Sequence, residues 1–287
     1  MDFEFSEDQE LLRASVRRFL AEQAPIAYVR ALLDDERGAT EDVWDGLAEL
    51  GATGLLVPEV HGGAGGGMVD MAVVLEELGR AVHPGPFASS AVGATSIVHL
   101  AGSDDDCATL LPGLASGEII GTVALGEPAA RATGGSGEWA LTGELAHVPD
   151  GASADIIIVS ATTADGELGV FVVDRSGAGV TVTPTPTVDG TRKLATVSLA
   201  DAPARRLGVG AGDSTDGVAE TLDRVVVAAV VDGVGAASRA LEMAVDYAKE
   251  RRQFDRPIGS FQAVQHVCAD MLRAVELARA GAYYACW

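Results

Sequence analysis

YAKERRQFDRPIGSFQAVQHVCAD, residues Tyr247–Asp270, contains the end of one predicted helix, a tight connection and the start of a second helix. Up to Phe254, small and apolar residues recur at helical spacing, at Ala240, Met243, Ala244, Tyr247 and Ala248. Pro257 and Gly259 break this pattern, and Ser260 is a suitable N-cap for the second helix. After it, one apolar face continues through Phe261, Val264, Val267, Cys268 and Met271. The stretch therefore predicts two helices joined by a short turn.

Three arginines lie at this connection, Arg251, Arg252 and Arg256, in a chain whose formal net charge is −22. Cationic side chains gathered at one corner of a strongly acidic molecule favour an anionic ligand there. The alternative is a solvated basic helix end, which is favourable against the negative end of the helix dipole. Charge alone leaves both interpretations open.

The same stretch resembles a run in the C-terminal domain of the acyl-CoA dehydrogenases, Y-x-x-x-R-x-x-F-G-x-P-I-x-x-F-Q-x-x-Q. Eight positions match it at fixed spacing: Tyr247, Arg251, Phe254, Pro257, Ile258, Phe261, Gln262 and Gln265. Asp255 stands where the family usually has glycine. The resemblance implies that Arg251, Phe254 and Gln262 contact the pyrophosphate and adenosine end of an FAD that a neighbouring subunit mainly binds. The chemistry agrees, because a guanidinium forms paired hydrogen bonds with phosphate oxygens and an amide can bind ribose or adenine.

The composition restricts the class of protein. With 287 residues and 48% hydrophobic content, the chain can bury a sizeable core, in two or three domains. Its 42 acidic residues against 20 basic ones argue against nucleic acid and give no support to an anionic membrane surface. Cys107, Cys268 and Cys286 have neither metal-ligand nor disulfide spacing, which favours a reducing cytoplasm. The acidic N-terminus has no apolar signal core, and no run of roughly twenty apolar residues is present. We therefore expect a soluble cytoplasmic protein without a metal site.

The pattern along the chain predicts an α+β protein. Residues 1–117 read as an N-terminal helical domain, with a capping box at Ser6 and Gln9 and a second helix from Thr40 to Gly51. The glycine-rich stretch LLVPEVHGGAGGG then precedes a long helix through Met71, Val74, Leu75 and Leu78. It lacks the Lys and Ser/Thr of a P-loop, so we interpret it as a loop between helices. The run Glu76–Gly79 matches an E-E-L-G run of the family, and two adjacent glutamates about 100° apart on a helix do not form an obvious catalytic pair.

Residues 118–208 form the predicted middle domain. Five β-branched runs, separated by Gly, Asp and Pro, indicate antiparallel strands: GTVAL, ADIIIVS, LGVFVVD, VTVTP and LATVSL. The resemblance implies a small β-barrel that covers one face of the flavin. The family's T-E-P-x-x-G-S-D flavin loop is retained here only as Gly126-Glu127-Pro128, so Gly126 is a predicted cofactor contact through its backbone. The family's Trp-Ile-Thr run should fall near His147 and is absent, and we interpret His147 as a loop or strand-end residue.

Residues 209–287 read as a partial C-terminal helical domain, with helices from about Thr215 onward. Small residues, among them Gly233 and Gly235, allow another helix or a ligand to approach the backbone closely. The apolar pattern is still unbroken at Tyr283–Trp287. This ending predicts either further residues or a partner that covers it.

The resemblance also implies a mechanism. Family members remove the α proton of an acyl-CoA thioester with a carboxylate, while the β hydrogen leaves as hydride to the flavin. By register from Tyr247, one of the family's two glutamate positions falls on Val225, and the other lies beyond residue 287. Valine cannot accept a proton, so no catalytic base is identified. Asp223 and Arg224 lie in the zone where family members contact CoA and are the predicted substrate-binding residues, although Asp223 also suits a first helical turn.

The resemblance spans the whole chain and implies an FAD-dependent acyl-CoA dehydrogenase. Such an enzyme forms the 2,3-enoyl-CoA and passes electrons to an electron-transfer flavoprotein, as a homo- or hetero-oligomer. The altered flavin loop and the missing base favour an alternative, a non-catalytic partner subunit that completes the FAD or substrate site of a heteromeric dehydrogenase. Unequal pairs of this kind occur in the family, including ones acting on steroid side chains. A truncated, inactive relative is the third interpretation.

Overall fold

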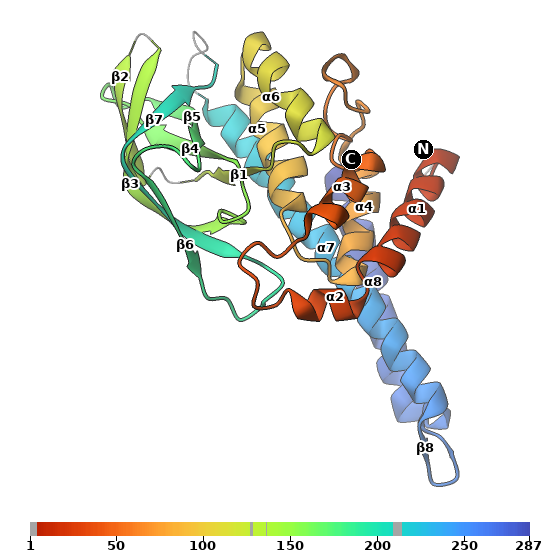
Figure 1. Cartoon of the computed structure of the whole chain (residues 1–287). Helices are drawn as coiled ribbons and strands as arrows, with labels where there is room; N and C mark the ends of the chain where they lie inside the picture. Colours follow the sequence, from red (N-terminus) through yellow and green to blue (C-terminus); the bar gives the residue numbers. More distant parts are fainter. Residues whose placement is uncertain (1–4, 127–128, 136, 209–213) are drawn as a thin grey trace.

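The computed structural model describes residues 5–126, 129–135, 137–208 and 214–287. Three parts follow one another along the chain (Figure 1): a group of N-terminal helices, a β-barrel, and a pair of long antiparallel helices. The predicted α+β architecture is therefore confirmed. The domain limits, 117/118 and 208/209, stay predictions.

Within the described residues, the N-terminal part is built from six α-helices, one 3-10 helix and one π-helix. They are α1 (Glu7–Gln23), α2 (Ile26–Ala31), α3 (Glu41–Glu49), η1 (Glu59–His61), α4 (Met68–Ala81), the π-helix η2 (Ala88–Ala94), α5 (Thr95–Ala101) and α6 (Asp104–Ser116). The predicted capping box is present, because the Gln9 N–H donates to Ser6 Oγ (3.1 Å) and the Ser6 N–H donates to Gln9 Oε1 (2.9 Å). Helix α4 is deeply buried, with its residues from Met71 to Gly79 all buried.

The middle part is a closed β-barrel. Its strands are β1 (Gly121–Ala124), β2 (Ala130–Gly135), β3 (Glu138–Pro149), β4 (Ile156–Thr162), β5 (Leu168–Asp174), β6 (Val180–Thr185) and β7 (Leu194–Arg206). Strand β4 pairs with β5, β5 with β7, β7 with β3, β3 with β2, and β2 returns to β4. Strands β1 and β6 extend the ring beside β4 and β7. The predicted barrel is confirmed, and most pairings are antiparallel, whereas β1–β4 and β2–β4 are parallel.

Two of these strands, β2 and β3, are missing from the sequence prediction. Their sequences, ARATGG and EWALTGELAHVP, are rich in Ala, Gly and Glu, which have low strand propensity. They are strands because β2 pairs along its whole length with β3, and β3 pairs with β7. Long-range pairing therefore overrides local preference here.

Helices α7 (Thr215–Glu250) and α8 (Gln262–Cys286) form the predicted helical hairpin. The short strands β8 (Arg252–Gln253) and β9 (Arg256–Pro257) and the turn η3 (Ile258–Ser260) connect them. Two details of the prediction are wrong. Helix α7 ends at Glu250 and not at Phe254, because the chain turns into the β8–β9 pair. Ser260 does not cap α8, since its hydroxyl donates to the Pro257 carbonyl (2.7 Å) and Phe261 takes the N-cap position.

The backbones of α4 and α7 approach each other closely at two glycines. A Cβ on Gly79 would lie 1.9 Å from the carbonyl oxygen of Asp232, and one on Gly235 would lie 2.0 Å from that of Glu76. Only a hydrogen atom fits at these positions, as predicted for Gly235. An added Cβ on Gly233 meets no atom within 4 Å, so this glycine faces open space.

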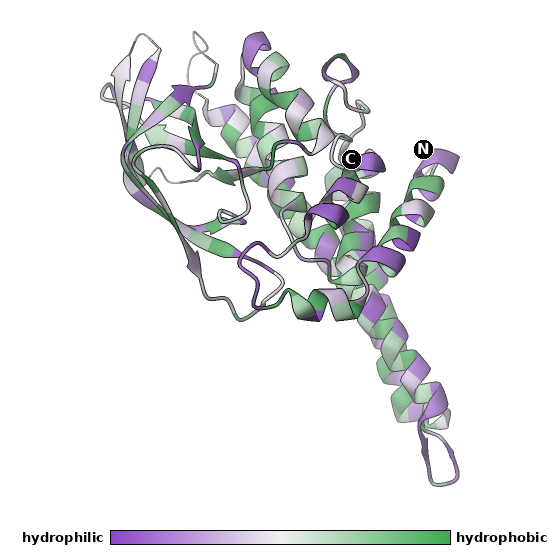
Figure 2. Cartoon of the chain, viewed as in Figure 1, coloured by the Kyte–Doolittle hydropathy of each residue, from purple (hydrophilic) through white to green (hydrophobic). Residues whose placement is uncertain are grey.

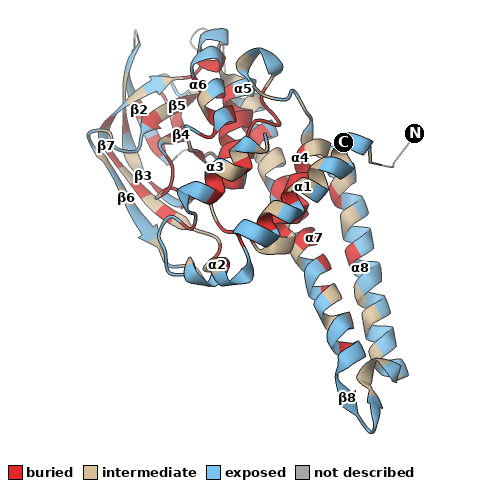
Figure 3. Ribbon diagram, turned by 45° about the vertical axis from the view of Figure 1, so that its right-hand side comes forward, coloured by how far each residue is buried: buried red, intermediate tan, exposed pale blue. Residues whose placement is uncertain are grey.

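The far half of the α7–α8 hairpin projects from the body of the molecule (Figures 1 and 3). Hydrophobic residues continue along this projecting part (Figure 2), although few of its residues are buried. In α8, Val275 and Ala282 are the only buried residues. Among the helices of the described ranges, none combines the length and the apolar character needed to span a bilayer.

Candidate functional site

The predicted cofactor-binding residues Arg251, Phe254 and Gln262 lie at the tip of the projecting hairpin. Arg251 follows the last residue of α7, Phe254 lies in the turn between β8 and β9, and Gln262 begins α8. All three are exposed, and Phe254 has 85% of its surface accessible. In the described part of the chain, neither the Arg251 guanidinium nor the Gln262 amide has a hydrogen-bond partner. These groups are therefore free to contact a molecule outside the chain.

The other two arginines of the connection hold the tip together. The Arg252 guanidinium donates to the Asp255 carbonyl (2.9 Å), and the Arg256 guanidinium lies over the Phe261 ring at 4.1 Å from its centre. A cation above an aromatic face is attracted by the ring's negative face. Arg251 is thus the one arginine of the three that the tip itself does not use.

The turn at the tip has an unfavourable backbone conformation. Phe254 has φ of +53° and Asp255 has φ of +61°, both in the left-handed region that favours glycine. Asp tolerates this region better than most residues, which explains how Asp255 can replace the family's glycine. Phenylalanine does not share that tolerance, so strain is concentrated at a predicted ligand contact.

The face of the hairpin opposite α4 is apolar and mostly exposed. On α7 a stripe with heptad spacing contains Val226, Val230, Gly233, Ala237, Ala240, Ala244 and Tyr247. On α8 a similar stripe, interrupted by Asp270, contains Ala263, Val267, Ala274, Leu277, Gly281 and Tyr284. Tyr247 is 58% exposed and Leu277 is 66% exposed. At about 100° per residue, both stripes point away from the side on which Gly235 and Arg279 meet α4. Apolar stripes with this spacing pack against other helices, so we expect an oligomer or further helices to cover this face.

Asp223 and Arg224, the predicted substrate-binding residues, line a pocket of about 330 Å³. Its other walls are Met68, Glu220, Val227, Ala285, Cys286 and Trp287. The Arg224 guanidinium donates to Glu220 (2.6 Å) and to Ser96 Oγ (3.4 Å), so its charge is already paired. Because the pocket walls contain two carboxylates, Glu220 and Asp223, and one guanidinium, the pocket suits hydroxyl, amide or apolar groups better than a phosphate.

Val225 packs at the junction of η2, β1 and α7. A Cβ on Gly93 would lie 3.5 Å from a Val225 methyl group and 3.1 Å from one of Val123. The neighbourhood of Val225 is therefore apolar, and this position supplies no proton acceptor.

The predicted contacts on the barrel side lie far from the hairpin tip. Gly126 follows β1, has φ of +126°, and an added Cβ there meets no atom within 4 Å. Glu127 and Pro128 lie outside the described residues. The barrel and the tip of the hairpin are at opposite ends of the molecule (Figure 1). The predicted contacts Gly126 and Arg251 therefore belong to two separate regions of the chain.

His147 is an exposed residue inside β3, at a β-bulge. Its φ is +58°, and the pairing of β3 with β7 shifts register between Leu145 and Val148. Bulges re-aim side chains and are enriched beside active sites. The predicted loop or strand-end position is therefore replaced by a place within β3, at its bulge. The structure shows no hydrogen-bond partner for the His147 side chain among the described residues, and the absence of a catalytic role stays a prediction.

Sequence reasoning missed one buried carboxyl group, that of Asp150. Burial raises the pKa of Asp150 to about 7, in the range of a general base at neutral pH. However, the residue is only 8% exposed, Ser89 Oγ of η2 donates to its carboxylate, and its N–H donates to the Lys193 carbonyl (2.9 Å). Asp150 therefore ties the barrel to η2 and is closed to a ligand. No local sequence signal distinguishes it from an ordinary turn aspartate.

Known proteins match the chain over nearly its whole length. Models of the acyl-CoA dehydrogenase N-terminal and C-terminal domains match residues 6–118 and 218–287. Acyl-CoA dehydrogenase IpdE2 of Mycolicibacterium smegmatis is 36% identical over 276 residues, which are 96% of this chain and 75% of that protein. The ChsE4–ChsE5 complex of Mycobacterium tuberculosis has a TM-score of 0.90 and 31% identity, covering 100% of this chain and 79% of the matched one. An acyl-CoA dehydrogenase complexed with FAD from Bacillus anthracis has a TM-score of 0.87 and 26% identity, covering 98% and 51%.

Proposed function

Because the chain belongs to the acyl-CoA dehydrogenase family of oxidoreductases acting on CH–CH bonds, we propose that it is a subunit of an FAD-dependent acyl-CoA dehydrogenase. The proposed reaction is the α,β-dehydrogenation of an acyl-CoA thioester to the 2,3-enoyl-CoA, with electrons passed to an electron-transfer flavoprotein. One observation carries the proposal: outside the body of the chain, the hairpin tip presents an exposed aromatic ring and a guanidinium and an amide that have no hydrogen-bond partner among the described residues.

The tip residues fit the diphosphate and adenosine end of FAD. Arg251 would form paired hydrogen bonds with diphosphate oxygens, and Gln262 would donate to or accept from ribose or adenine. Phe254 supplies apolar area for the nucleotide. In a chain with a net charge of −22, a cation on a projecting tip also lets an anion approach without crossing the acidic surface. FAD, when bound, accepts the hydride that leaves the substrate β carbon.

The substrate-side residues suit the uncharged part of an acyl-CoA. The Arg224–Glu220 pair and the nearby Asp223 carboxylate would repel the CoA phosphates, whereas amide and hydroxyl groups can bond to them. We therefore propose that this pocket takes pantetheine or acyl atoms. Val225 excludes one of the family's two base positions, so the carboxylate that removes the α proton is not at this place in the chain.

A second candidate function is that of a non-catalytic partner subunit. A specific observation favours it: the tip that serves a neighbour's flavin is retained, whereas Gly126, His147 and Val225 replace side chains that act at the chain's own site. The ChsE4–ChsE5 relative is itself a complex of two different chains. In this reading the chain completes a site on another subunit and has no reaction of its own.

Absorption spectroscopy distinguishes the two functions. The dehydrogenase reading expects the purified chain to carry about one flavin per site, with the flavin bands bleached by an acyl-CoA under anaerobic conditions. The partner reading expects a colourless chain that acquires flavin only when it is co-expressed with a second dehydrogenase subunit. If neither preparation contains flavin, the proposed role of the tip is wrong.

A further inference from the structure

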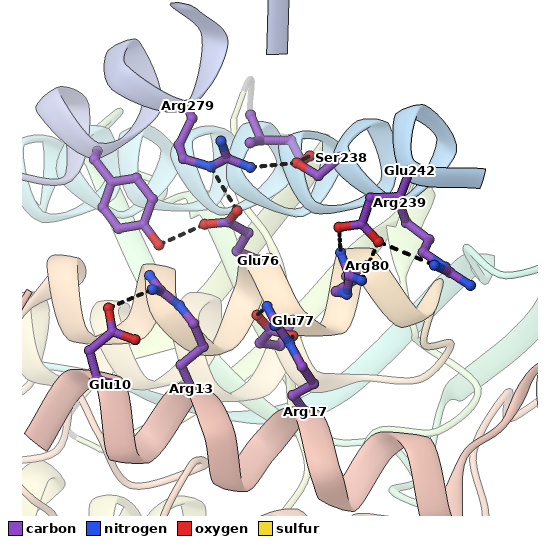
Figure 4. A network of polar contacts seen from close by, with 12 residues as sticks. Glu10, Arg13, Arg17, Glu76, Glu77, Arg80, Ser238, Arg239, Glu242 and Arg279 are labelled. Atoms are coloured by element: carbon purple, nitrogen blue, oxygen red, sulfur yellow. Dashed lines mark hydrogen bonds and ion pairs between the residues drawn. The ribbon is translucent and has the colours of Figure 1, made fainter. Parts of the chain in front are cut away.

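The polar network in Figure 4 joins α4 to the base of the α7–α8 hairpin. Arg279 of α8 is at its centre, since Nε donates to Glu76 Oε1 on α4 (2.9 Å) and a terminal nitrogen donates to Ser238 Oγ on α7 (2.6 Å). Tyr283, one turn further along α8, donates its hydroxyl to the other oxygen of Glu76 (2.9 Å). We call Glu76, Ser238, Arg279 and Tyr283 the clamp. It connects three helices through one buried carboxylate.

The clamp resists change because its carboxylate is buried and paired, whereas the Arg279 side chain is partly exposed. Glu76 and Ser238 are each 9% exposed. Burial, together with the Glu76 charge, raises the pKa of Tyr283 above its ordinary value, so its hydroxyl stays a donor at neutral pH. Removing one partner of a buried ion pair leaves the other charge uncompensated, which is strongly unfavourable. The clamp therefore fixes both the tilt and the rotation of α8 against α4.

Two glutamates near the clamp, Glu77 on α4 and Glu276 on α8, provide matched comparisons. Glu77 accepts two hydrogen bonds from Arg17 of α1, at 2.8 and 2.6 Å, and so holds a different helix. Glu276 pairs with Arg279 from within α8 itself and joins no two helices. Glu76, Glu77 and Glu276 thus carry the same chemical group, and only Glu76 connects α4 to the hairpin.

Because α8 is long, a small tilt of this helix at the clamp moves the hairpin tip by a larger distance. From Arg279 to Gln262 the helix extends about 25 Å, at about 1.5 Å per residue. A tilt of about 5° at the clamp would therefore move the tip by about 2 Å. Hydrogen bonds to phosphate lose most of their strength over such a displacement, because donor and acceptor must lie about 2.7–3.2 Å apart.

We propose that Glu76 and Arg279 are positioning residues for the neighbouring subunit's flavin. The clamp sets the direction in which the hairpin presents Arg251, Phe254 and Gln262, and so controls flavin affinity from a place that touches no flavin atom. This inference rests on the proposed function of the tip. It also gives the E-E run of α4 a role in cofactor binding without making either glutamate a catalytic residue.

Flavin titration of the apo-assembly tests the link between clamp and cofactor. Glu76→Gln should weaken FAD binding by about tenfold or more, as expected for a misplacement near 1 Å. Glu77→Gln should lower the stability of the assembly and change FAD affinity by less than about twofold, and Glu276→Gln should change neither. An equal loss of affinity in the Glu76 and Glu77 variants would mean that stability alone is responsible, and would overturn the proposal.

A distance measurement tests the clamp independently of flavin. Nitroxide labels are placed at Lys249→Cys near the tip and at Ala108→Cys on α6, in a chain in which Ala replaces Cys268 and Cys286. Pulsed electron paramagnetic resonance between the two labels then reports the spread of tip positions. We expect a broader or shifted distance distribution in Glu76→Gln than in Glu77→Gln. An unchanged distribution would overturn the positioning role. If the distribution broadens but neither Glu76→Gln nor Arg251→Ala changes FAD affinity, the hairpin is positioned by the clamp and the proposed function of the tip is the part that fails.

Discussion

Helix α4 and the hairpin tip use charged side chains in opposite ways. On α4, Glu76, Glu77 and Arg80 each pair with an opposite charge on another helix. At the tip, Arg251 is exposed and has no partner within the described ranges, and the neighbouring Phe254 is 85% exposed. The two regions belong to the same strongly acidic chain, so composition does not explain the difference.

The difference separates the side chains that packing within the chain accounts for from those that it does not. The charges of α4 are accounted for by packing within the body, because each one holds a second helix in place. The tip adopts a strained turn, and its Arg251 and Gln262 side chains have no hydrogen-bond partner among the described residues, so they stabilise nothing there. Features of this kind indicate a partner outside the chain, which we propose to be the flavin site of another subunit.

The largest expected effect comes from a substitution in the body of the molecule, where the backbones of α4 and α7 are in close contact. In Gly235→Ala the new methyl group would overlap the Glu76 carbonyl oxygen, which lies 2.0 Å from the Cβ position. We expect a loss of about 3 kcal/mol in unfolding free energy, measured by urea denaturation. Gly233→Ala is the matched control, since its methyl group meets open space and alanine is the better helix former. If both variants were equally stable, the close contact of α4 and α7 would be in error.

Removing the Arg251 charge tests whether the hairpin tip binds flavin. Arg251→Ala should weaken FAD binding to the assembly by about 10- to 100-fold, the value of one or two charge-assisted hydrogen bonds. Its unfolding free energy should change by less than about 0.5 kcal/mol, because the side chain is exposed and has no hydrogen-bond partner among the described residues. Arg252→Ala should weaken FAD less, since Arg252 bonds to the Asp255 carbonyl. Full retention of flavin in Arg251→Ala would contradict the assignment.

The pH dependence of stability distinguishes buried from exposed groups. The folded-state pKa of Asp150 is about 7 against an ordinary 3.8, so the native state binds more protons than the unfolded state between these values. Stability should therefore fall as pH rises through this window, by up to about 1.4 kcal/mol per pH unit, and Asp150→Asn should remove that slope. The pKa of His83 is lowered by burial to about 4, so its contribution has the opposite sign and is lost as pH falls from 6.5 through 4. Urea titrations at pH 5, 6, 7 and 8 measure both slopes, and an unchanged slope in Asp150→Asn would show that the carboxyl is not buried as described.

The smallest expected effect tests whether the left-handed backbone conformation of Asp255 destabilises the turn at the tip. Asp255→Gly restores the residue that suits φ of +61° and should stabilise the turn by about 0.5–1 kcal/mol. The Ile258 N–H, which donates to the Arg251 carbonyl (2.8 Å), should then exchange with solvent about two- to fivefold more slowly. Faster exchange would mean that the aspartate stabilises the turn in a way the structure does not show.

The sequence predicts features that depend on local spacing and misses those that depend on distant pairing. The hairpin, the tip residues and five of the seven barrel strands are encoded in runs that can be read without their neighbours. Strands β2 and β3 become strands only through their pairing partners, and Arg279 meets Glu76 across 203 positions of sequence. The N-cap of α8 was predicted at Ser260, whose hydroxyl bonds to a nearby carbonyl instead. The pairing of Asp150 with Ser89 is likewise a contact between domains that no spacing reveals.

The most direct test of the central claim is a density map of the FAD-loaded assembly. We expect the Arg251 guanidinium within about 3 Å of a diphosphate oxygen of a flavin whose ring lies against another subunit. Phe254 and Gln262 of the same tip should flank its adenosine. A map in which the barrel of the same chain holds the whole cofactor, with Arg251 facing solvent, would contradict the account.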